Sequence, residues 1–265
     1  MPSITRPLAN LGRATAGAVN GVGYAAMLLV DALRLSLFGW RQGQPVRLRA
    51  VAEQMRQIGV DALPIVVLLA MTIGIMLGIQ FIAALGEFGA QSQVVVAVAK
   101  SVTREFGALI TAILVAGRSG SSLAARIGSM TVSQEVDALA VMGIEPVRYL
   151  VAPALIAMFV MLPALTIFAN TIAIFGAALY CAPALNVTPS AYLLQTLSLL
   201  SPGDLWQGLA KSAVFAVLIT LIGVSTGFSV SGGAEGVGRA TTRAVVLSIC
   251  WIIVADMVFS FFLNR

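Results

Sequence analysis

The 265-residue chain has no histidine and only two cysteines. Without histidine it cannot form a Ser-His-Asp triad, a Cys-His dyad or a zinc site of the usual kind. Cys181 and Cys250 stand alone and far apart, so they supply neither metal-ligand spacing nor a disulfide framework. These absences exclude most hydrolase and metalloenzyme chemistry. We therefore expect no catalytic residue, no metal site and no resident cofactor.

Charged residues are also scarce. They make up 10% of the chain, against roughly 25% in soluble domains, while 59% of the residues are apolar. This composition excludes a water-soluble globule and predicts an all-α integral membrane protein. The net charge of +5 would suggest nucleic acid in a soluble protein. In a membrane protein the positions of the charged residues along the chain are more informative than their sum, because they indicate the orientation in the membrane. No nucleic-acid partner is expected.

Hydrophobic runs predict five transmembrane helices. The uncharged run 62–86 is long enough, at about 1.5 Å per residue, to cross a hydrocarbon core of about 30 Å. Prolines break the long uncharged region that follows residue 149, so residues 189–200 are expected to form a short external helix. The five spans are predicted at about 62–86, 90–117, 150–180, 212–230 and 244–263.

The distribution of arginine and lysine predicts the orientation. Arginines occupy the N-terminal segment and the connections after the second and fourth spans, whereas connections 86–92 and 181–209 contain no arginine or lysine. The positive-inside rule then places the N-terminus in the cytoplasm and the C-terminus outside. Residues 1–60 are predicted to be a cytoplasmic segment, with an interfacial amphipathic helix over 14–33. A cleaved or re-entrant segment is the alternative there.

The connection between the second and third spans is long and patterned. Thr131 and Gln134 have capping-box spacing, and Gly143 and Pro146 follow an apolar helical pattern as a stop signal. We predict a short amphipathic helix, which either rests on the bilayer or docks on a cytoplasmic partner. The preceding G-R-S-G-S-S lacks the P-loop pattern and predicts close packing or a tight turn. The glycine-rich segment 231–243 is predicted to be a cytoplasmic turn.

Five charged residues fall inside the predicted spans, where each costs about 2.5–3.5 kcal/mol at the membrane centre. They are Lys100, Arg104, Glu105, Lys211 and Asp256. Charge arithmetic predicts the pairs Glu105–Lys211 and Arg104–Asp256, leaving Lys100 to extend toward the head groups. These charges either hold the bundle together or serve a proton relay or a lipid phosphate.

Five short motifs together resemble the MlaE (YrbE) family of ABC-transporter permeases, over about residues 45–265. They are R-E-F-G at 104–107, A-G-R-S-G-S at 116–121, I-G-S-M at 127–130, D-A-L-A-V-M-G-I-E-P at 137–146 and R-A-T-T-R at 239–243. The resemblance implies an MlaE-type permease domain over 61–265. It further implies that the loop helix is a coupling helix seated on an ATPase, through Ser133, Glu135, Asp137, Leu139, Met142 and Gly143.

The resemblance also implies partners and a task. Members are homodimeric permeases of MCE-type lipid transport systems in the bacterial inner membrane, and their two cytoplasmic ABC ATPase subunits bind the ATP. A periplasmic hexamer of MCE-domain proteins and, in the phospholipid system, a STAS-domain subunit complete the assembly. The implied task is to move phospholipid between the inner membrane and the periplasmic carrier, which maintains the lipid asymmetry of the outer membrane.

Small residues and methionines alternate along the first span. Such a face by default packs helices or contacts lipid. The resemblance implies instead an outward-facing cavity for lipid tails, lined by Leu77, Ala84, Leu85, Phe88 and Phe106. Two other functions stay open on the residues alone. One is a secondary transporter that uses Glu105 and Asp256 as ion sites, and the other is a membrane scaffold.

Overall fold

The computed structural model describes residues 48–263 together with Gly23, Met27, Leu28 and Val30. In this part of the chain the regular structure is helical and contains no strand. Five helical segments are long and apolar enough to cross a membrane: Leu48–Gly86, Gln91–Val132, Val147–Ala184, Pro202–Phe228 and Gly233–Leu263. The all-α, five-span prediction is confirmed. The interfacial helix predicted at 14–33 lies almost wholly outside the described residues.

Several of these segments are composed of more than one element. The first comprises α2 (Leu48–Ile58), the 3-10 turn η2 (Val60–Ala62) and α3 (Leu63–Gly86). The second comprises η3 (Gln91–Gln93), α4 (Val94–Ser101), η4 (Val102–Phe106), α5 (Gly107–Val115), η5 (Ala116–Gly120) and α6 (Ser121–Val132). The remaining elements are α7 (Glu135–Val141), η6 (Val147–Val151), α8 (Ala152–Ala184), α9 (Pro189–Leu199), α10 (Pro202–Phe228) and α11 (Gly233–Leu263).

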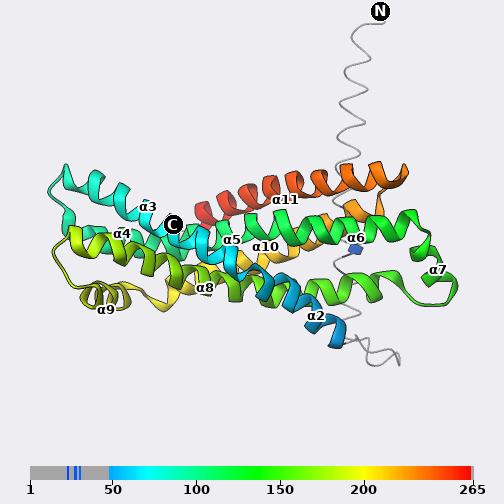
Figure 1. The fold of residues 1–265 in the computed structure, drawn as a ribbon, viewed down its shortest axis with the longest axis horizontal. Coiled ribbons are helices and arrows are strands. Elements are labelled where there is room, and N and C mark those ends of the chain that lie inside the picture. The colour runs from blue at the N-terminus through cyan, green and yellow to red at the C-terminus, as the bar shows by residue number, and fades with distance from the viewer. Residues whose placement is uncertain (1–22, 24–26, 29, 31–47, 264–265) are drawn as a thin grey trace, which may run out of the picture.

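The long segments lie side by side along one axis (Figure 1). The α3–α4 turn and α9 lie at one end of the bundle, and α7 lies at the other end (Figure 1). Helix α8 is central, because it packs against α2, α3, α5 and α10. Helix α11 is peripheral and packs on α10 and α6. The two ends of the bundle therefore present different elements, and the polar groups described below lie between them.

The second segment is longer than the predicted span 90–117. It continues as one helical segment to Val132. The charged residues Arg118 and Arg126 lowered the hydropathy and ended the predicted span, but they do not end the helix. The G-R-S-G-S-S motif is not a turn. A Cβ on Gly120 would lie 3.0 Å from Ile219 Cγ2, and one on Gly223 would lie 3.1 Å from the Gly120 oxygen. The small residues of the motif therefore let α10 pack closely, which was the other predicted role.

The helices that contain the fourth and fifth predicted spans begin before those spans do. Helix α10 begins at Pro202 rather than Ser212, because Ser201 and Asp204 form a reciprocal capping box. Helix α11 begins at Gly233 rather than Ala244, and the chain reverses at Gly232 and Gly233, whose φ angles are +88° and +69°. Most of the segment predicted as a turn is therefore helical.

A short helix is present where one was predicted, as α9, with its caps at Thr188 and Leu200. The Thr188 side chain caps it by accepting a hydrogen bond of 3.2 Å from the Ala191 amide. Its buried side chains, Tyr192 and Thr196, hold it against the bundle, where it packs on α8 and α4. Burial raises the pKa of the Tyr192 phenol, so this side chain stays neutral.

The start of the loop helix differs from the prediction. Thr131 is still inside α6, where its hydroxyl donates to the Ile127 carbonyl, and Gln134 adopts a left-handed φ of 60° without a side-chain cap. The predicted Thr131–Gln134 capping box is therefore wrong, because α6 runs past the position where a cap was expected. The predicted stop is confirmed. Gly143 has φ +72°, and the Ile144 amide donates to the Leu139 carbonyl after α7 ends.

Two glycines of the first span, Gly74 and Gly78, face α8. A Cβ on Gly74 would collide with the backbone of Ala173, and one on Gly176 would lie 2.6 Å from the Met71 carbonyl oxygen. Helices α3 and α8 therefore approach at backbone contact distance on both sides of their interface. This is the packing that small residues allow in membranes, and it explains their spacing along the span.

Candidate functional site

A buried cluster of charged side chains joins three of the long segments. Lys211 on α10 is fully buried, and its Nζ lies 2.5 Å from Glu105 Oε2 on η4. The same Nζ lies 3.0 Å from Asp256 Oδ1 on α11, an ion pair without the alignment of a hydrogen bond. Ser260 completes the cluster by donating to Glu105 Oε1 at 2.9 Å. We call these four residues the Lys211 cluster.

The Lys211 cluster holds one cation and two carboxylates, so its formal charge is −1. An unbalanced charge in a membrane interior raises the free energy of the folded protein. Removing one partner of a buried ion pair also destabilises a protein more than replacing the whole pair with apolar side chains does. Uptake of one proton, or a cation, would neutralise the cluster. Within residues 48–263, no three His, Cys, Asp or Glu side chains are grouped so as to hold a metal ion.

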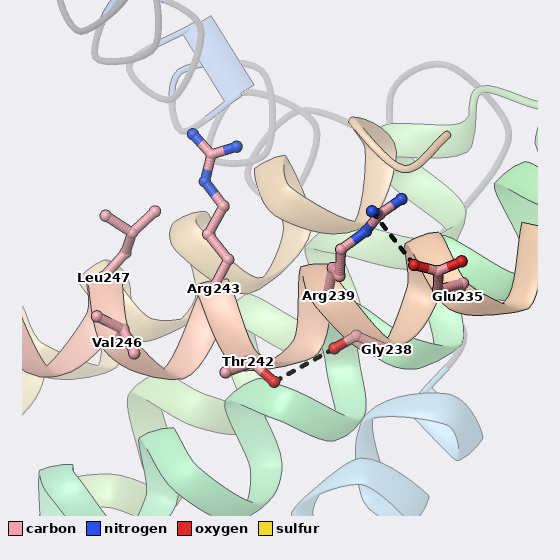
Figure 2. A pocket seen from close by; sticks show the side chains of 7 residues that line it. All are labelled: Glu235, Gly238, Arg239, Thr242, Arg243, Val246 and Leu247. Atoms are coloured by element: carbon pink, nitrogen blue, oxygen red, sulfur yellow. Dashed lines mark hydrogen bonds and ion pairs between the residues drawn. The ribbon is translucent and has the colours of Figure 1, made fainter. Parts of the chain in front are cut away.

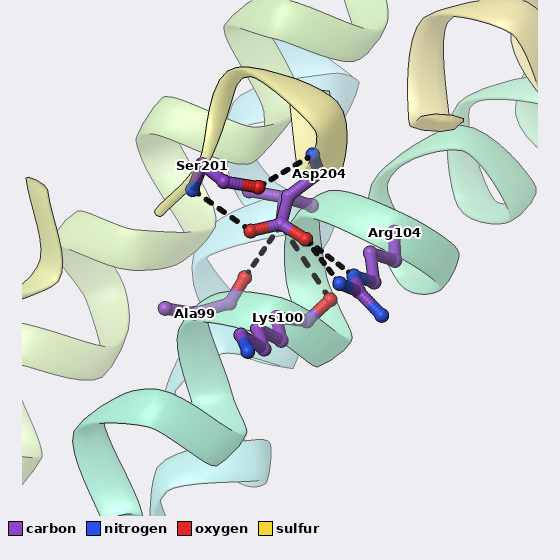
Figure 3. Close-up of polar contacts among 6 residues, drawn as sticks. Ala99, Lys100, Arg104, Ser201 and Asp204 are labelled. Carbon is purple, nitrogen blue, oxygen red and sulfur yellow. Dashed lines mark hydrogen bonds and ion pairs between the residues drawn. The ribbon is translucent and has the colours of Figure 1, made fainter. Parts of the chain in front are cut away.

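A second ion pair lies nearer the α9 end of α10. Arg104 contacts Asp204 Oδ1 through Nε and Nη2, both at 2.5 Å, and the Ser201 amide donates to Asp204 Oδ2 at 2.9 Å. Figure 3 shows Asp204 between these two partners. Only 1% of the Asp204 side chain is exposed, against 36% for Arg104. The aspartate therefore has two tasks, since it caps α10 and ties that cap to the second segment.

The predicted pairing is half right. The Glu105–Lys211 pair is present, but the predicted Arg104–Asp256 pair is wrong, because Asp256 shares Lys211 and Arg104 binds Asp204. Asp204 was missed because residues 181–209 were taken as an external connection. The signal that could have found it is S-P-G-D at 201–204, a capping-box pattern with proline at the first helical position. Lys100 is partly buried and has no ion pair within the described part of the chain.

The backbone around Arg104 and Glu105 is a single π-helical turn, η4. Such turns occur frequently at functional sites, since the extra residue redirects the side chains around it. Here the two neighbours reach different parts of α10, positions 204 and 211. Gly208 lies between those positions, and a Cβ there would collide with the Thr103 carbonyl. The absence of that Cβ allows α10 to lie directly on the π turn.

The five residues expected to line a lipid-tail cavity are not gathered in one hollow of the single chain. Leu77 is 4% exposed in the single chain and belongs to its core, because that face of α3 packs inward. Leu85 and Phe106 are partly buried against the same core. Ala84 is exposed, and Phe88 is 82% exposed beyond the end of α3. These last two offer apolar surface to lipid or to another chain.

An open groove of about 730 Å³ follows the start of α11, at the R-A-T-T-R motif. Arg239 pairs there with Glu235 at 3.3 Å, one helical turn away, and Arg243 points away from the helix (Figure 2). Within the part of the chain that the structure describes, seven residues line the groove, and all of them belong to α11. This wall of the groove is a helix surface with exposed arginines.

The residues expected to form the coupling helix lie at the end of the bundle that α7 occupies (Figure 1). Ser133, Glu135 and Asp137 are exposed, Leu139 is partly buried, and Met142 and Gly143 are exposed after the helix. The most exposed large apolar side chains at this end are Val141, at 89%, and Met142, at 64%. Sequence reasoning missed Val141, although it directly precedes Met142. The projecting end thus combines two apolar side chains with two acids.

Comparisons with known proteins agree on one family. The family model described as "Permease MlaE" matches residues 51–262. A "Probable ABC transporter permease protein" of Rickettsia felis is 36% identical over 212 residues, which is 80% of this chain and 82% of that protein. The "Intermembrane phospholipid transport system permease protein MlaE" of Haemophilus influenzae is 34% identical over 215 residues, covering 79% and 82%. "Protein TRIGALACTOSYLDIACYLGLYCEROL 1, chloroplastic" of Arabidopsis thaliana is 35% identical, covering 81% and 61%.

Proposed function

Because the chain belongs to the MlaE permease family, we propose that it is the membrane subunit of an ABC transporter that moves phospholipid between the bacterial inner membrane and a periplasmic MCE carrier. Two copies form the permease. ATP is bound and hydrolysed by a separate cytoplasmic ATPase, and a STAS-domain subunit accompanies it. The transported lipid contributes to the asymmetry of the outer membrane. The permease itself makes and breaks no covalent bond.

The observation that carries this proposal is the position and surface of α7. It projects at one end of the bundle, joins the second and third segments directly, and exposes Val141 and Met142 beside two acids. None of the seven residues of α7 is buried, so the exposed apolar side chains here do not pack into the core of the bundle. Exposed apolar surface of this kind is typical of a site that binds another protein. A helix seated on an ATPase can transmit the movements of that ATPase to both segments.

The test is purification of the full chain, tagged at its N-terminus, from native membranes in mild detergent. Mass spectrometry is expected to find an ABC ATPase, an MCE-domain protein and phospholipid. The double variant Val141→Ser with Met142→Ser is expected to lose the ATPase while keeping its thermal stability. Its matched control is Leu194→Ser with Leu197→Ser on α9, at the other end, where the two leucines are 68% and 71% exposed. Equal ATPase recovery from both variants would contradict the role of α7.

The Lys211 cluster favours a second candidate, an ion-coupled transporter. Its formal charge of −1 suits uptake of a proton, and such groups in membrane segments mark proton pathways in many pumps. Reconstituted vesicles without ATPase distinguish the two candidates. Lipid movement that follows a pH gradient under those conditions would favour ion coupling, and movement that requires ATPase and ATP would favour the first proposal.

A further inference from the structure

A pocket of about 300 Å³ lies between the end of α2, the η5–α6 stretch and the start of α8. It is separate from the Lys211 cluster and from the α11 groove. Four polar residues of its lining lie on one face of the second segment, at spacings of about one and two helical turns. They are Arg118, Ser119, Ser122 and Arg126. The α2 side contributes Gln54, Gln57 and Asp61.

The charges of the pocket favour an anion. Arg118 is held in place, since its Nη1 donates to the Gln57 carbonyl at 3.2 Å. Arg126 makes no hydrogen bond or ion pair with any part of the chain that the structure describes. Asp61 is the one acid among the described residues that line the pocket, and no ion pair within that part joins it to either arginine. Two guanidinium groups against one carboxylate give a formal charge of +1.

The chemistry of these donors suits a phosphate group. A guanidinium presents several N–H groups in a planar fork that matches phosphate oxygens, and serine hydroxyls add further donors. Ser119 and Ser122 supply hydroxyls on the same face. The remaining wall is apolar and includes Ile58, Leu123 and Met158. The polar side chains of the pocket suit a phosphate group, and its apolar side chains suit a hydrocarbon chain joined to that phosphate.

The position of the pocket along the second segment agrees with that match. Hydropathy ends the lipid-crossing part of this segment near residue 117, so Arg118 lies at that boundary and Arg126 lies about 12 Å further along the helix. Basic side chains at this level meet the head groups, where anionic lipids attract them.

We propose that this pocket binds a phosphate group, presented by an anionic phospholipid of the leaflet at the α7 end of the bundle. The same donors would accept inorganic phosphate, and the experiment separates the two sources. The proposal does not rest on the proposed function, because a boundary phosphate site can exist in any membrane protein.

The test uses the full-length chain in detergent. Native mass spectrometry during titration with dioleoyl phosphatidylglycerol gives the affinity, and thermal unfolding with added inorganic phosphate gives the soluble arm. Arg126→Gln is expected to weaken lipid binding about tenfold, as loss of one charge-assisted contact does. Arg243→Gln is the matched control, because it removes an exposed arginine outside the pocket. Should Arg126→Gln not fold, Ser122→Met, which fills the mouth, replaces it.

The measured affinities distinguish a lipid phosphate from inorganic phosphate. Lipid binding that depends on Arg126, and that inorganic phosphate does not displace, supports the proposal with a lipid as the source. Stabilisation by inorganic phosphate that depends on Arg126, without any preference for the lipid, overturns the lipid source. Equal affinities in Arg126→Gln and Arg243→Gln overturn the pocket itself. An intermediate affinity for Arg126→Lys, which keeps the charge and loses the fork, supports recognition by the guanidinium.

Discussion

Lys211 Nζ and Glu105 Oε2 lie 2.5 Å apart, although the two residues are 106 positions apart in the chain. Their burial is unequal, since Lys211 is fully buried and 30% of the Glu105 side chain is exposed. The cation is therefore the member that depends completely on its partners. Glu105 can exchange part of its interaction for water or head groups, whereas the only polar partners of Lys211 among the described residues are Glu105, Asp256 and Ser260.

This asymmetry predicts unequal effects of neutralisation. Lys211→Met leaves two carboxylates close together without a cation, and we expect it to lower the free energy of unfolding by about 3–5 kcal/mol. Glu105→Gln leaves the Lys211–Asp256 pair, which is neutral overall, so its loss is expected to be smaller. Thermal and denaturant unfolding in mixed micelles measures both. A Glu105→Gln variant less stable than Lys211→Met would contradict the charge count.

The Arg104–Asp204 pair predicts coupling between the second and fourth segments. We expect a double-mutant cycle with Arg104→Gln and Asp204→Asn to give an interaction energy of about 1–3 kcal/mol, because Asp204 is buried and also caps α10. Unfolding of the two single variants and the double variant supplies the cycle. Arg104→Gln with Asp256→Asn is the control, and it should be additive, since no ion pair joins those two residues in the described part.

Gly208 predicts a steric effect. Gly208→Ala places a Cβ against the Thr103 carbonyl, a backbone atom that cannot turn aside, so α10 must move from the π turn. The expected cost is about 1–3 kcal/mol, as for other overpacked sites. Gly238→Ala is the control, because no atom in the described part of the chain lies within 4 Å of its Cβ and alanine favours a helix. Equal melting temperatures for the two variants would show that the α10 contact is loose.

Gly143 predicts a conformational effect at the end of α7. Its φ of +72° favours glycine, and no atom of the described residues lies within 4 Å of a Cβ there, so Gly143→Ala acts through the backbone. We expect a loss of about 1 kcal/mol in the local stability of α7. Hydrogen exchange of the α7 amides measures this loss. Gln134→Gly should have the opposite effect, because Gln134 carries the same left-handed strain at φ 60°.

The fold was predictable where hydropathy decides it. Five runs of apolar residues give five segments, because only a helix can satisfy its own backbone in lipid. The lengths were not predictable from the same signal. The second segment continues as a helix beyond Arg118, since hydropathy detects the lipid boundary and a helix need not end there. The capping-box pattern gave a wrong helix start at Thr131, whereas at Ser201 it would have given the correct one. Burial and tertiary contacts decide which of two such patterns begins a helix.

The site was predictable to the level of charge arithmetic. Lys211 must have an acid nearby because it lies in an apolar span, and span direction suffices to choose Glu105. Arithmetic failed for Asp256, since one cation serves two carboxylates. Counting charges assumes that each cation pairs with one carboxylate. Which carboxylates share a cation becomes visible only once the helices are packed together. The pocket at Arg126 needed three segments to converge, so no local pattern could reveal it.

The 42-residue second segment is a rod about 63 Å long that reaches from the α3–α4 turn to α7. A tilt of about 5° around its middle would move each end by about 3 Å, in opposite directions. The charged groups of η4 lie near the pivot, whereas α7 and the α3–α4 turn lie at the tips. A push on α7 would thus become an opposite swing at the far surface, with its greatest amplitude where Phe88 projects. Such a movement would displace the end of the bundle opposite α7, while the salt bridges near the middle of the segment stay closed.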